Sequence, residues 1–262
     1  MIALERRDGR PLRIGHRGAA ALGPENTLGA FRAAREAGVD AIEFDLLRLW
    51  TGEIVVAHSN DLNEVSHGAH AGTVIDKSLE ELRVHSPDLP TLEDAIAYFL
   101  DEAPELGVHA DVKTASAVVE VGRALIRSGL QERAFVTSTN FRSLRELARR
   151  EPSLRTALTF PRAVLGISET GRGAPAGRLA LRMVRATLPV LAGTLLRLSR
   201  TTALSLHHSV VTSAAVDRAH ARGAAVIAWT VDDPEELARV VRAGVDAVVS
   251  NNPPIFASTL RA

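Results

Sequence analysis

The sequence predicts a parallel (β/α)8 barrel, the TIM-barrel fold. Eight short apolar runs of β-type residues alternate with amphipathic helical stretches along the 262 residues, which is the pattern of repeated β-α units. Glycines such as Gly38 and Gly244 fall just past helical stretches, where a left-handed C-cap is expected. An open doubly wound sheet is the alternative. It is disfavoured because no glycine-rich phosphate-binding motif follows any of the runs.

The eight runs define the expected strands. They are Leu12–His16, Ala41–Leu46, Val108–Val112, Ala134–Ser138, Leu154–Thr159, Ala203–His207, Ala225–Thr230 and Ala247–Ser250. The helices expected between them are Leu28–Ala37, Leu92–Leu100, Ala117–Ser128, Phe141–Arg150, Ser213–Arg222 and Pro234–Ala243. Residues at the carboxyl ends of parallel barrel strands meet at one rim, where the active sites of such barrels lie.

Two segments interrupt the alternation. Ile54–His58 follows the second strand after a short turn, so it is either a hairpin partner of that strand or a barrel strand reached by a tight turn. Residues 59–90 are polar and contain several His and Gly residues, and they predict a short excursion over the barrel mouth. No stretch reads as a linker, so residues 1–262 are expected to form a single barrel domain.

Composition excludes several classes of function. The formal net charge is zero, which does not support nucleic-acid binding. The chain has no cysteine, which excludes disulfides and thiolate metal sites. The first residues contain no apolar leader, and no uninterrupted apolar run approaches about 18 residues. We therefore expect a cytoplasmic protein without a membrane span.

Glu43 and Asp45 alternate along the second expected strand, so both side chains point to the same face. If that face is the barrel interior, the two carboxylates repel each other unless a cation lies between them. Oxygen ligands favour Mg²⁺ or Ca²⁺ over zinc. The alternatives are a solvated strand face or pairing with Arg17 or Arg48.

Asp111 and Lys113 repeat this spacing at the end of the third expected strand. If both side chains project to the same face, the carboxylate of Asp111 suits a third metal ligand and the ammonium of Lys113 suits an anion-binding group. The alternative is an isolated salt bridge between the two. Only Lys77 and Lys113 are lysines among the 31 Lys and Arg residues. This scarcity indicates that a compact ammonium group is favoured at Lys113.

Four further side chains lie at or just past the ends of expected strands. His16 and His58 each follow an apolar run and could form an acid–base pair at neutral pH, although each alone would read as a hydrogen-bonded structural histidine. Arg17 offers a planar fork to a phosphate or carboxylate. Trp229, at the end of a late strand, would either line the substrate pocket or seal the top of the barrel.

Together these motifs resemble the glycerophosphodiester phosphodiesterase family, which belongs to the same broad superfamily as phosphatidylinositol-specific phospholipase C. The resemblance covers nearly the whole chain. The matching elements are H-R-G at 16–18, the run P-E-N-T-L-G-A-F, E-F-D at 43–45, the run V-V-A-H, D-V-K at 111–113, W-T-V and the closing G-V-D-A. The N-terminal cluster is the most specific part, and the fold that it implies is again the (β/α)8 barrel.

The resemblance also implies roles for individual residues. Three carboxylates would hold one divalent cation, Mg²⁺ or Ca²⁺: Glu43, Asp45 and Asp111. His16 and His58 would act as the general base and acid. Arg17 and Lys113 would contact the phosphate. The implied reaction hydrolyses a small glycerophosphodiester to an alcohol and glycerol 3-phosphate through a cyclic glycerophosphate.

Three positions depart from the family pattern. Ser59 stands where members carry Asp after the second histidine, with Asp61 two places on, which puts the orientation of His58 in question. Asp111 replaces a Glu and is one methylene shorter, so the metal geometry is also in question. The closing strand runs into Asn251 instead of the usual T-D pair.

Residues 174–200 predict an arginine-rich helical insertion before a late strand, divided into two helices at Pro189. No acidic residue occurs from Gly171 to Val216. A basic amphipathic segment could rest on an anionic bilayer as a peripheral membrane contact, which would favour lysophospholipids and a lysophospholipase-D-like activity. The alternative is a barrel helix with a solvated arginine face.

We expect the protein to be bacterial. A further alternative to the hydrolase, for the whole chain, is a catalytically impaired barrel that binds phosphodiesters.

Overall fold

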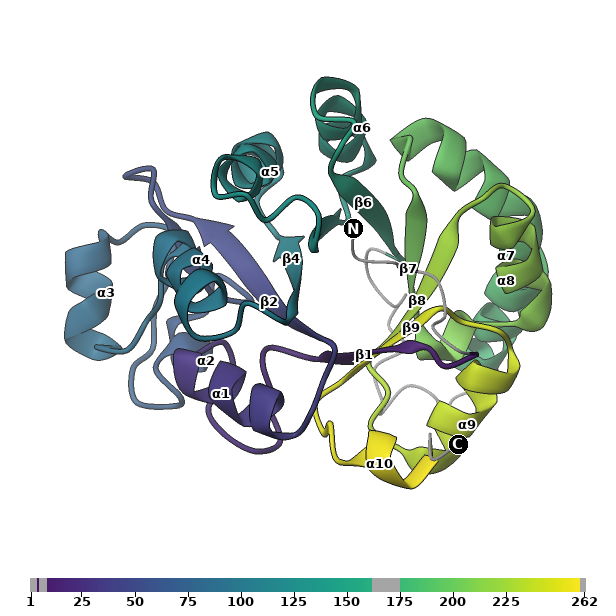
Figure 1. Ribbon diagram of the computed structural model, residues 1–262, viewed down its shortest axis with the longest axis horizontal. Coiled ribbons are helices and arrows are strands. Elements are labelled where there is room, and N and C mark those ends of the chain that lie inside the picture. The colour runs from purple at the N-terminus through teal and green to yellow at the C-terminus, as the bar shows by residue number, and fades with distance from the viewer. Residues whose placement is uncertain (1–3, 5–8, 162–174, 260–262) are drawn as a thin grey trace.

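Eight parallel strands form a closed barrel, as predicted, with the helices outside the ring of strands (Figure 1). The computed structural model describes residue 4 and residues 9–161 and 175–259. The strand order is β1-β9-β8-β7-β6-β5-β4-β2, and β1 also pairs with β2 to close the ring. This closing pair excludes the open doubly wound sheet.

The barrel strands are β1 Leu12–Gly15, β2 Ala41–Arg48, β4 Gly107–Val112, β5 Ala134–Ser138, β6 Arg155–Phe160, β7 Ala203–His207, β8 Ala225–Trp229 and β9 Ala247–Ser250. The helices outside them are α1 Leu28–Glu36, α4 Leu92–Asp101, α5 Val118–Arg127, α6 Phe141–Arg150, α7 Pro175–Ser199, α8 Ser213–His220, α9 Pro234–Arg242 and α10 Ile255–Thr259. Short 3-10 turns lie at Ala115–Ala117 and His208–Val210. The predicted strands and helices are therefore confirmed apart from small shifts of their ends.

The barrel strands are buried on both faces, and their two faces differ in chemistry. On β2, Ile42, Phe44 and Leu46 belong to the large apolar core shared with the surrounding helices, whereas Glu43 and Asp45 alternate with them and point into the barrel. A separate apolar cluster fills the interior. It is rich in alanine: Ala41, Ala157, Ala203, Ala225 and Ala247. All but Ala157 are the first residues of their strands, so this cluster closes the amino end of the barrel.

The excursion after the second strand is a small packed unit beside the barrel. β3 (Ile54–Val56) pairs antiparallel with the end of β2, which confirms the hairpin alternative. α2 (Leu62–Val65) and α3 (Leu79–His85) follow. They share a core of their own with nearby residues: Leu47, Leu49, Val55, Ala57, Leu62, Val65, Val74, Leu82 and Leu89. The predicted excursion is therefore confirmed. Its apolar side chains pack sideways against β2 and β3, and Figure 1 shows α3 at the outer edge.

The arginine-rich segment forms one helix, α7, which connects β6 to β7 around the barrel. The prediction that Pro189 divides it is wrong, because the proline lies inside the helix. Leu188, Ala192 and Leu196 recur at helical spacing on both sides of the proline and are buried in the main core. Burying these side chains offsets the backbone hydrogen bond that proline cannot make.

Within the described residues, one helical segment is long and apolar enough to cross a membrane by length and composition alone. It is Arg178–Ser199 of α7, with a mean hydropathy of 1.4 over its most apolar window. Core helices of soluble proteins meet the same criterion. In this barrel α7 packs against α6 and α8, so its apolar composition is partly explained by its place in the fold.

Candidate active site

The register of neighbouring strands brings the predicted carboxylates together. On adjacent strands β2 and β4, Glu43 lies beside His109 and Asp45 lies beside Asp111. Asp111 in turn lies beside Thr137 on β5. Because all three strands are parallel and end at the same rim, these inward-facing side chains form one continuous polar patch.

The three carboxylates expected to bind a cation form a compact buried cluster. Glu43, Asp45 and Asp111 each offer an oxygen within 4.8 Å of the others. Their exposed fractions are only 3%, 0% and 9%. Three oxygen donors at this spacing suit a hard divalent cation such as Mg²⁺ or Ca²⁺. The shorter side chain of Asp111 still brings its carboxylate into the cluster.

Glu43 shows why a cation fits this cluster. Burial, followed by the charges of Asp45 and Asp111, raises the pKa of Glu43 well above its usual value. The backbone N–H of Arg17 donates to Glu43 Oε2 at 2.8 Å and compensates only part of this cost. A divalent cation would replace the proton that the cluster otherwise retains.

The two cations predicted to contact phosphate also touch the carboxylates. Lys113 Nζ lies 2.7 Å from Asp45 Oδ1 and 2.5 Å from Asp111 Oδ2. Arg17 Nε lies 3.2 Å from Asp45 Oδ2, and Arg17 Nη1 lies 2.6 Å from Glu25 Oε1. Burial alone would raise the pKa of Asp45, but Lys113 and Arg17 lower it below its usual range. Asp45 is therefore ionised and held between two positive charges.

The turn after β1 brings a further side chain to Asp45. Gly18 has φ +85°, and a Cβ there would lie 2.6 Å from the carbonyl carbon of Ala30, so only glycine lets the turn approach α1 this closely. Asn26 Nδ2 then donates to Asp45 Oδ2 at 2.9 Å, while Asn26 Oδ1 accepts from the Asp45 N–H. Thr27 caps α1, so Asn26 is free to orient Asp45.

His16 has a defined tautomer. Asn251 Nδ2 donates to Asp232 Oδ2 at 2.6 Å, which orients the Asn251 amide with Oδ1 towards His16. His16 Nδ1 lies 2.6 Å from that oxygen, so Nδ1 carries the proton and donates it. Nε2 is left as a lone pair, 3.8 Å from Glu43 Oε2. Burial and the charge of Arg17 lower the pKa of His16 to about 4, so the ring is neutral at pH 7.

His58 has a different environment from His16. It follows β3, and its Nδ1 lies 3.3 Å from Glu64 Oε2. Ser59 Oγ donates to the same carboxylate oxygen at 2.6 Å. Asp61 instead caps α2. Glu64 therefore supplies the orienting carboxylate that the family pattern places directly after this histidine, and Ser59 positions Glu64.

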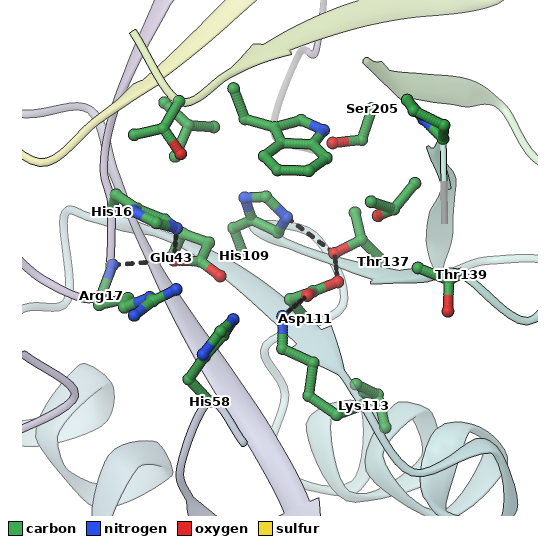
Figure 2. Close-up of a pocket in the computed structure, with 16 residues that line it drawn as sticks. His16, Arg17, Glu43, His58, His109, Asp111, Lys113, Thr137, Thr139 and Ser205 are labelled. Carbon is green, nitrogen blue, oxygen red and sulfur yellow. Dashed lines mark hydrogen bonds and ion pairs between the residues drawn. The ribbon is translucent and has the colours of Figure 1, made fainter. Parts of the chain in front are cut away.

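These side chains line one cavity of about 350 Å³ at the carboxyl end of the barrel. The lining includes every predicted site residue except Asp45, which lies just behind it: His16, Arg17, Glu43, His58, Asp111, Lys113 and Trp229. Figure 2 shows the labelled charged groups around the lower part of the view and the hydroxyls of Thr137, Thr139 and Ser205 on the other side. The cavity is thus charged on one wall and hydroxyl-rich on the other, and its size suits a small ligand.

Four residues at this site had no part in the site's chemistry predicted from the sequence, although Asn26 was a candidate helix cap: Asn26, Glu64, His109 and Asn251. Asn26 lies in the P-E-N-T run, where it competes with Thr27 as a helix cap, so its role depends on which of the two forms the cap. Asn251 contacts a histidine 235 positions away. No local pattern in the sequence indicates a contact of that kind.

The fold and this site together define a barrel enzyme of the phosphoric diester hydrolase class. The chain belongs to the glycerophosphoryl diester phosphodiesterase family, because the sequence profile of that family matches residues 16–255. The match begins at His16, directly after β1, and ends at Ile255, the first residue of α10, and it therefore includes every residue of the cavity.

Relatives of similar length are named as phosphodiesterases. A glycerophosphodiester phosphodiesterase from Caldanaerobacter subterraneus subsp. tengcongensis is 26% identical, over 96% of this chain and 98% of the relative. A solved glycerophosphodiester phosphodiesterase from Thermotoga maritima superposes with a TM-score of 0.73 at 21% identity, over 96% and 99% of the two chains. An Oleispira antarctica phosphodiesterase solved with the product sn-glycerol-3-phosphate gives a TM-score of 0.71 at 20% identity, over 96% and 97%. At these identities the solved structures support the fold.

Proposed function

We propose that this chain hydrolyses glycerophosphodiesters to an alcohol and glycerol 3-phosphate, in a reaction that depends on a divalent cation and on His16 and His58. We further propose that residues 1–262 act as a single barrel domain in the cytoplasm. One observation carries the proposal: two histidines with different hydrogen-bond partners flank a buried acidic cluster in one cavity. The names of the relatives support the substrate class.

The charged wall of the cavity would bind the phosphodiester. Glu43, Asp45 and Asp111 would hold Mg²⁺ or Ca²⁺, which when bound supplies positive charge to the phosphodiester oxygens. The side chain of Lys113 is 29% exposed, so its ammonium can contact the phosphate while it remains paired with the carboxylates. Arg17, which also lines the cavity, would add a second fixed charge. Both cations would stabilise negative charge as it develops on the phosphate.

His16 suits the role of general base in the first step. Its Nε2 lone pair would accept the proton of the attacking hydroxyl, which comes from the glycerol unit of the substrate or from water. The hydroxyl oxygen then forms a bond to phosphorus as the bond to the departing alcohol breaks. The hydrogen bond from Nδ1 to Asn251 keeps Nε2 available for this step.

His58 suits the role of general acid. Its Nδ1 faces the carboxylate of Glu64, so Nε2 is the ring nitrogen that would present a proton to the substrate. That proton would pass to the oxygen of the departing alcohol. If the glycerol hydroxyl is the nucleophile, the product is a cyclic glycerophosphate. Water would then open it, with His58 accepting and His16 returning a proton.

A direct assay tests the proposal. Release of glycerol 3-phosphate from glycerophosphocholine, glycerophosphoethanolamine and glycerophosphoinositol would be measured with Mg²⁺, with Ca²⁺ and after chelation. We expect H16N and H58N each to lower kcat by about 10²–10⁴-fold. H70N, a change at an exposed histidine outside the cavity, serves as the matched control. A folded wild-type chain that releases no product with either cation would instead favour the impaired, phosphodiester-binding barrel.

A second candidate substrate, a lysophospholipid, is favoured by the surface of α7. Five large apolar side chains of this helix are exposed, by 42–75%: Leu179, Met183, Val190, Leu191 and Leu198. Exposed arginines accompany them: Arg178, Arg182, Arg197 and Arg200. Because α7 runs back from the carboxyl end of β6, its first turns lie at the same end of the barrel as the cavity. We propose that this surface rests on an anionic bilayer as a peripheral contact.

Because α7 is a barrel helix, this contact is best tested with point substitutions. A variant with L179Q, M183Q, V190Q and L191Q would be compared with a control carrying V84Q and W50Q, which change exposed apolar residues elsewhere. Cosedimentation with vesicles that contain phosphatidylglycerol should fall for the helix variant and not for the control. Equal cosedimentation of the helix variant and the wild type would rule out the contact, whatever the result of the hydrolysis assay.

A further inference from the structure

His109 is a buried histidine in the cavity that has no role in the proposed proton transfers. It lies on β4 two residues before Asp111, and its ring stacks on Phe135 with centroids 4.2 Å apart. Its side chain lines the cavity together with His16 and Trp229. In Figure 2 its ring lies between Glu43 and Thr137. A histidine in this position can contact a ligand without being a metal ligand or a proton carrier.

The hydrogen bonds around Thr137 determine which ring nitrogen of His109 carries the proton. Thr137 Oγ1 lies 2.5 Å from Asp111 Oδ1. A carboxylate can only accept, so the threonine hydroxyl donates to it. The same hydroxyl oxygen lies 2.9 Å from His109 Nε2. Because the hydroxyl has only one hydrogen, it must accept from Nε2–H at this contact. His109 Nδ1 is therefore the unprotonated nitrogen and presents a lone pair.

That lone pair has no hydrogen-bond partner among the described residues, although His109 Nδ1 is buried. Figure 2 shows this nitrogen on the side of the ring away from Thr137. Buried polar atoms are nearly always hydrogen-bonded in native proteins. Trp229 Nε1 is buried, likewise lacks a partner among the described residues, and belongs to a side chain that lines the same cavity. The cavity wall therefore offers one unused acceptor and one unused donor.

We propose that His109 determines specificity by accepting, through Nδ1, a hydrogen bond from a free hydroxyl of the glycerol unit of the substrate. An acceptor cannot bind an ionised phosphate oxygen or an ester carbonyl, because neither carries a hydrogen, so this position selects a donor such as an O–H group. Trp229, whose Nε1–H also lacks a partner among the described residues, lines the same cavity and offers a donor to a second polar group of the ligand. This inference rests on the proposed function, since it names the part of the substrate that the hydroxyl-rich wall recognises.

Two substitutions separate the two nitrogens of His109. H109N places an amide oxygen near the position of Nδ1 but does not reach Thr137. H109Q places an amide nitrogen near Nε2, which preserves the bond to Thr137, and leaves no acceptor at Nδ1. Glycerophosphocholine is the test substrate because its only hydroxyls belong to glycerol. Propylphosphocholine, which has neither hydroxyl, is the matched competitive ligand.

We expect H109Q to raise the KM for glycerophosphocholine about tenfold, the usual effect of one lost hydrogen bond to a ligand. The Ki of propylphosphocholine and the affinity for Mg²⁺ should stay unchanged, and H109N should bind glycerophosphocholine nearly as the wild type does. Equal loss of affinity for both ligands in H109Q, or altered Mg²⁺ affinity, would assign His109 a structural role and overturn the proposal. An effect seen only with glycerophosphoinositol would also overturn it, because the hydroxyl would then belong to the departing alcohol.

Two binding measurements keep this test independent of turnover and of variant folding. Calorimetric titration of glycerophosphocholine and of propylphosphocholine reads the hydroxyl contact even if the chain does not hydrolyse either compound. Nitrogen NMR of wild-type protein with labelled histidine reads the tautomer directly. We expect Nδ1 of His109 to be unprotonated, and its resonance to shift with glycerophosphocholine and not with propylphosphocholine. Identical spectra with the two ligands would refute the contact.

Discussion

Asn251 Oδ1 lies 2.6 Å from His16 Nδ1, although the two residues are 235 positions apart in the chain. The amide cannot rotate freely, because its nitrogen donates to Asp232. This contact holds the imidazole in the tautomer that leaves Nε2 as a proton acceptor. The closing strand of the barrel thus determines which nitrogen of the first histidine is available for chemistry.

Replacing Asn251 should change the pH dependence of the reaction. In N251D a carboxylate faces His16 and stabilises the charged imidazolium, so the pKa of His16 rises from its value of about 4. The base is then protonated at higher pH, and the acidic limb of kcat/KM moves to higher pH. N251A should lower kcat about tenfold with little change in KM. A pH–rate profile of N251D that coincides with that of the wild type would contradict this role.

Cation binding should stabilise the fold, and more so at high pH. The raised pKa of Glu43 makes a contribution to stability that is present below the ordinary Glu pKa and is lost as the pH rises and the proton leaves. A bound cation replaces that proton. We therefore expect millimolar Mg²⁺ or Ca²⁺ to raise Tm, with a larger rise at pH 8 than at pH 5.5.

Glu43 can be tested separately by a neutral substitution. At a pH high enough for Glu43 to lose its proton, E43Q removes the repulsion among the carboxylates, so it should raise Tm in the absence of cations and reduce the rise that Mg²⁺ produces. The measurement is thermal unfolding of both chains with Mg²⁺ and with chelator. An E43Q chain that is less stable than the wild type without cations would show that the acidic cluster is not under electrostatic strain.

Lys113 should stabilise the chain most when no divalent cation is present. K113M leaves Asp45 and Asp111 without their nearest positive charge. We expect a loss of about 2–3 kcal/mol in the free energy of unfolding, below the usual cost of breaking a fully buried pair because Lys113 is partly exposed. K77M, at the only other lysine, should cost less than about 0.5 kcal/mol. Denaturant unfolding compares the two, and equal stabilities would contradict the prediction.

Two residues of α7 test whether the helix belongs to the barrel core. Leu188 is fully buried, whereas Val190, two residues on, is 75% exposed. L188A should lower the free energy of unfolding by about 2–4 kcal/mol, since it leaves a cavity in the core. V190A should change it by less than about 0.5 kcal/mol. Similar effects of both substitutions would indicate that α7 does not pack as a barrel crossover.

The sequence predicts those parts of the molecule that depend on local periodicity. Glu43 and Asp45 share a face because strand side chains alternate, and the carboxyl ends of parallel strands meet at one rim. These two rules gather most of the site. Local periodicity did not predict that Pro189 lies inside a continuous helix, because the burial of Leu188 and Ala192 on either side of it overrides the tendency of proline to end a helix.

Contacts between distant segments also escape the sequence. The partner of His58 is Glu64, which lies on the short helix α2. The polar sequence around Glu64 gives no pattern from which this helix could be predicted. From the sequence alone, His109 is one more residue of a buried strand. Its role becomes visible only in the structure, where Thr137 lies beside it on the neighbouring strand. Such roles depend on which side chains the closed barrel brings into contact, and they follow from tertiary structure alone.

The position of β9, the last strand of the chain, between β8 and β1 has a consequence for the way this molecule is made. A ribosome-bound chain that has emerged only as far as α9 already contains the three acids of the cluster, Lys113 and the two histidines proposed as base and acid. It still lacks β9, which lies between β8 and β1 and leads into the asparagine that fixes the first imidazole. We therefore expect hydrolysis to begin only after synthesis is complete, and a fragment that ends before residue 247 to be inert.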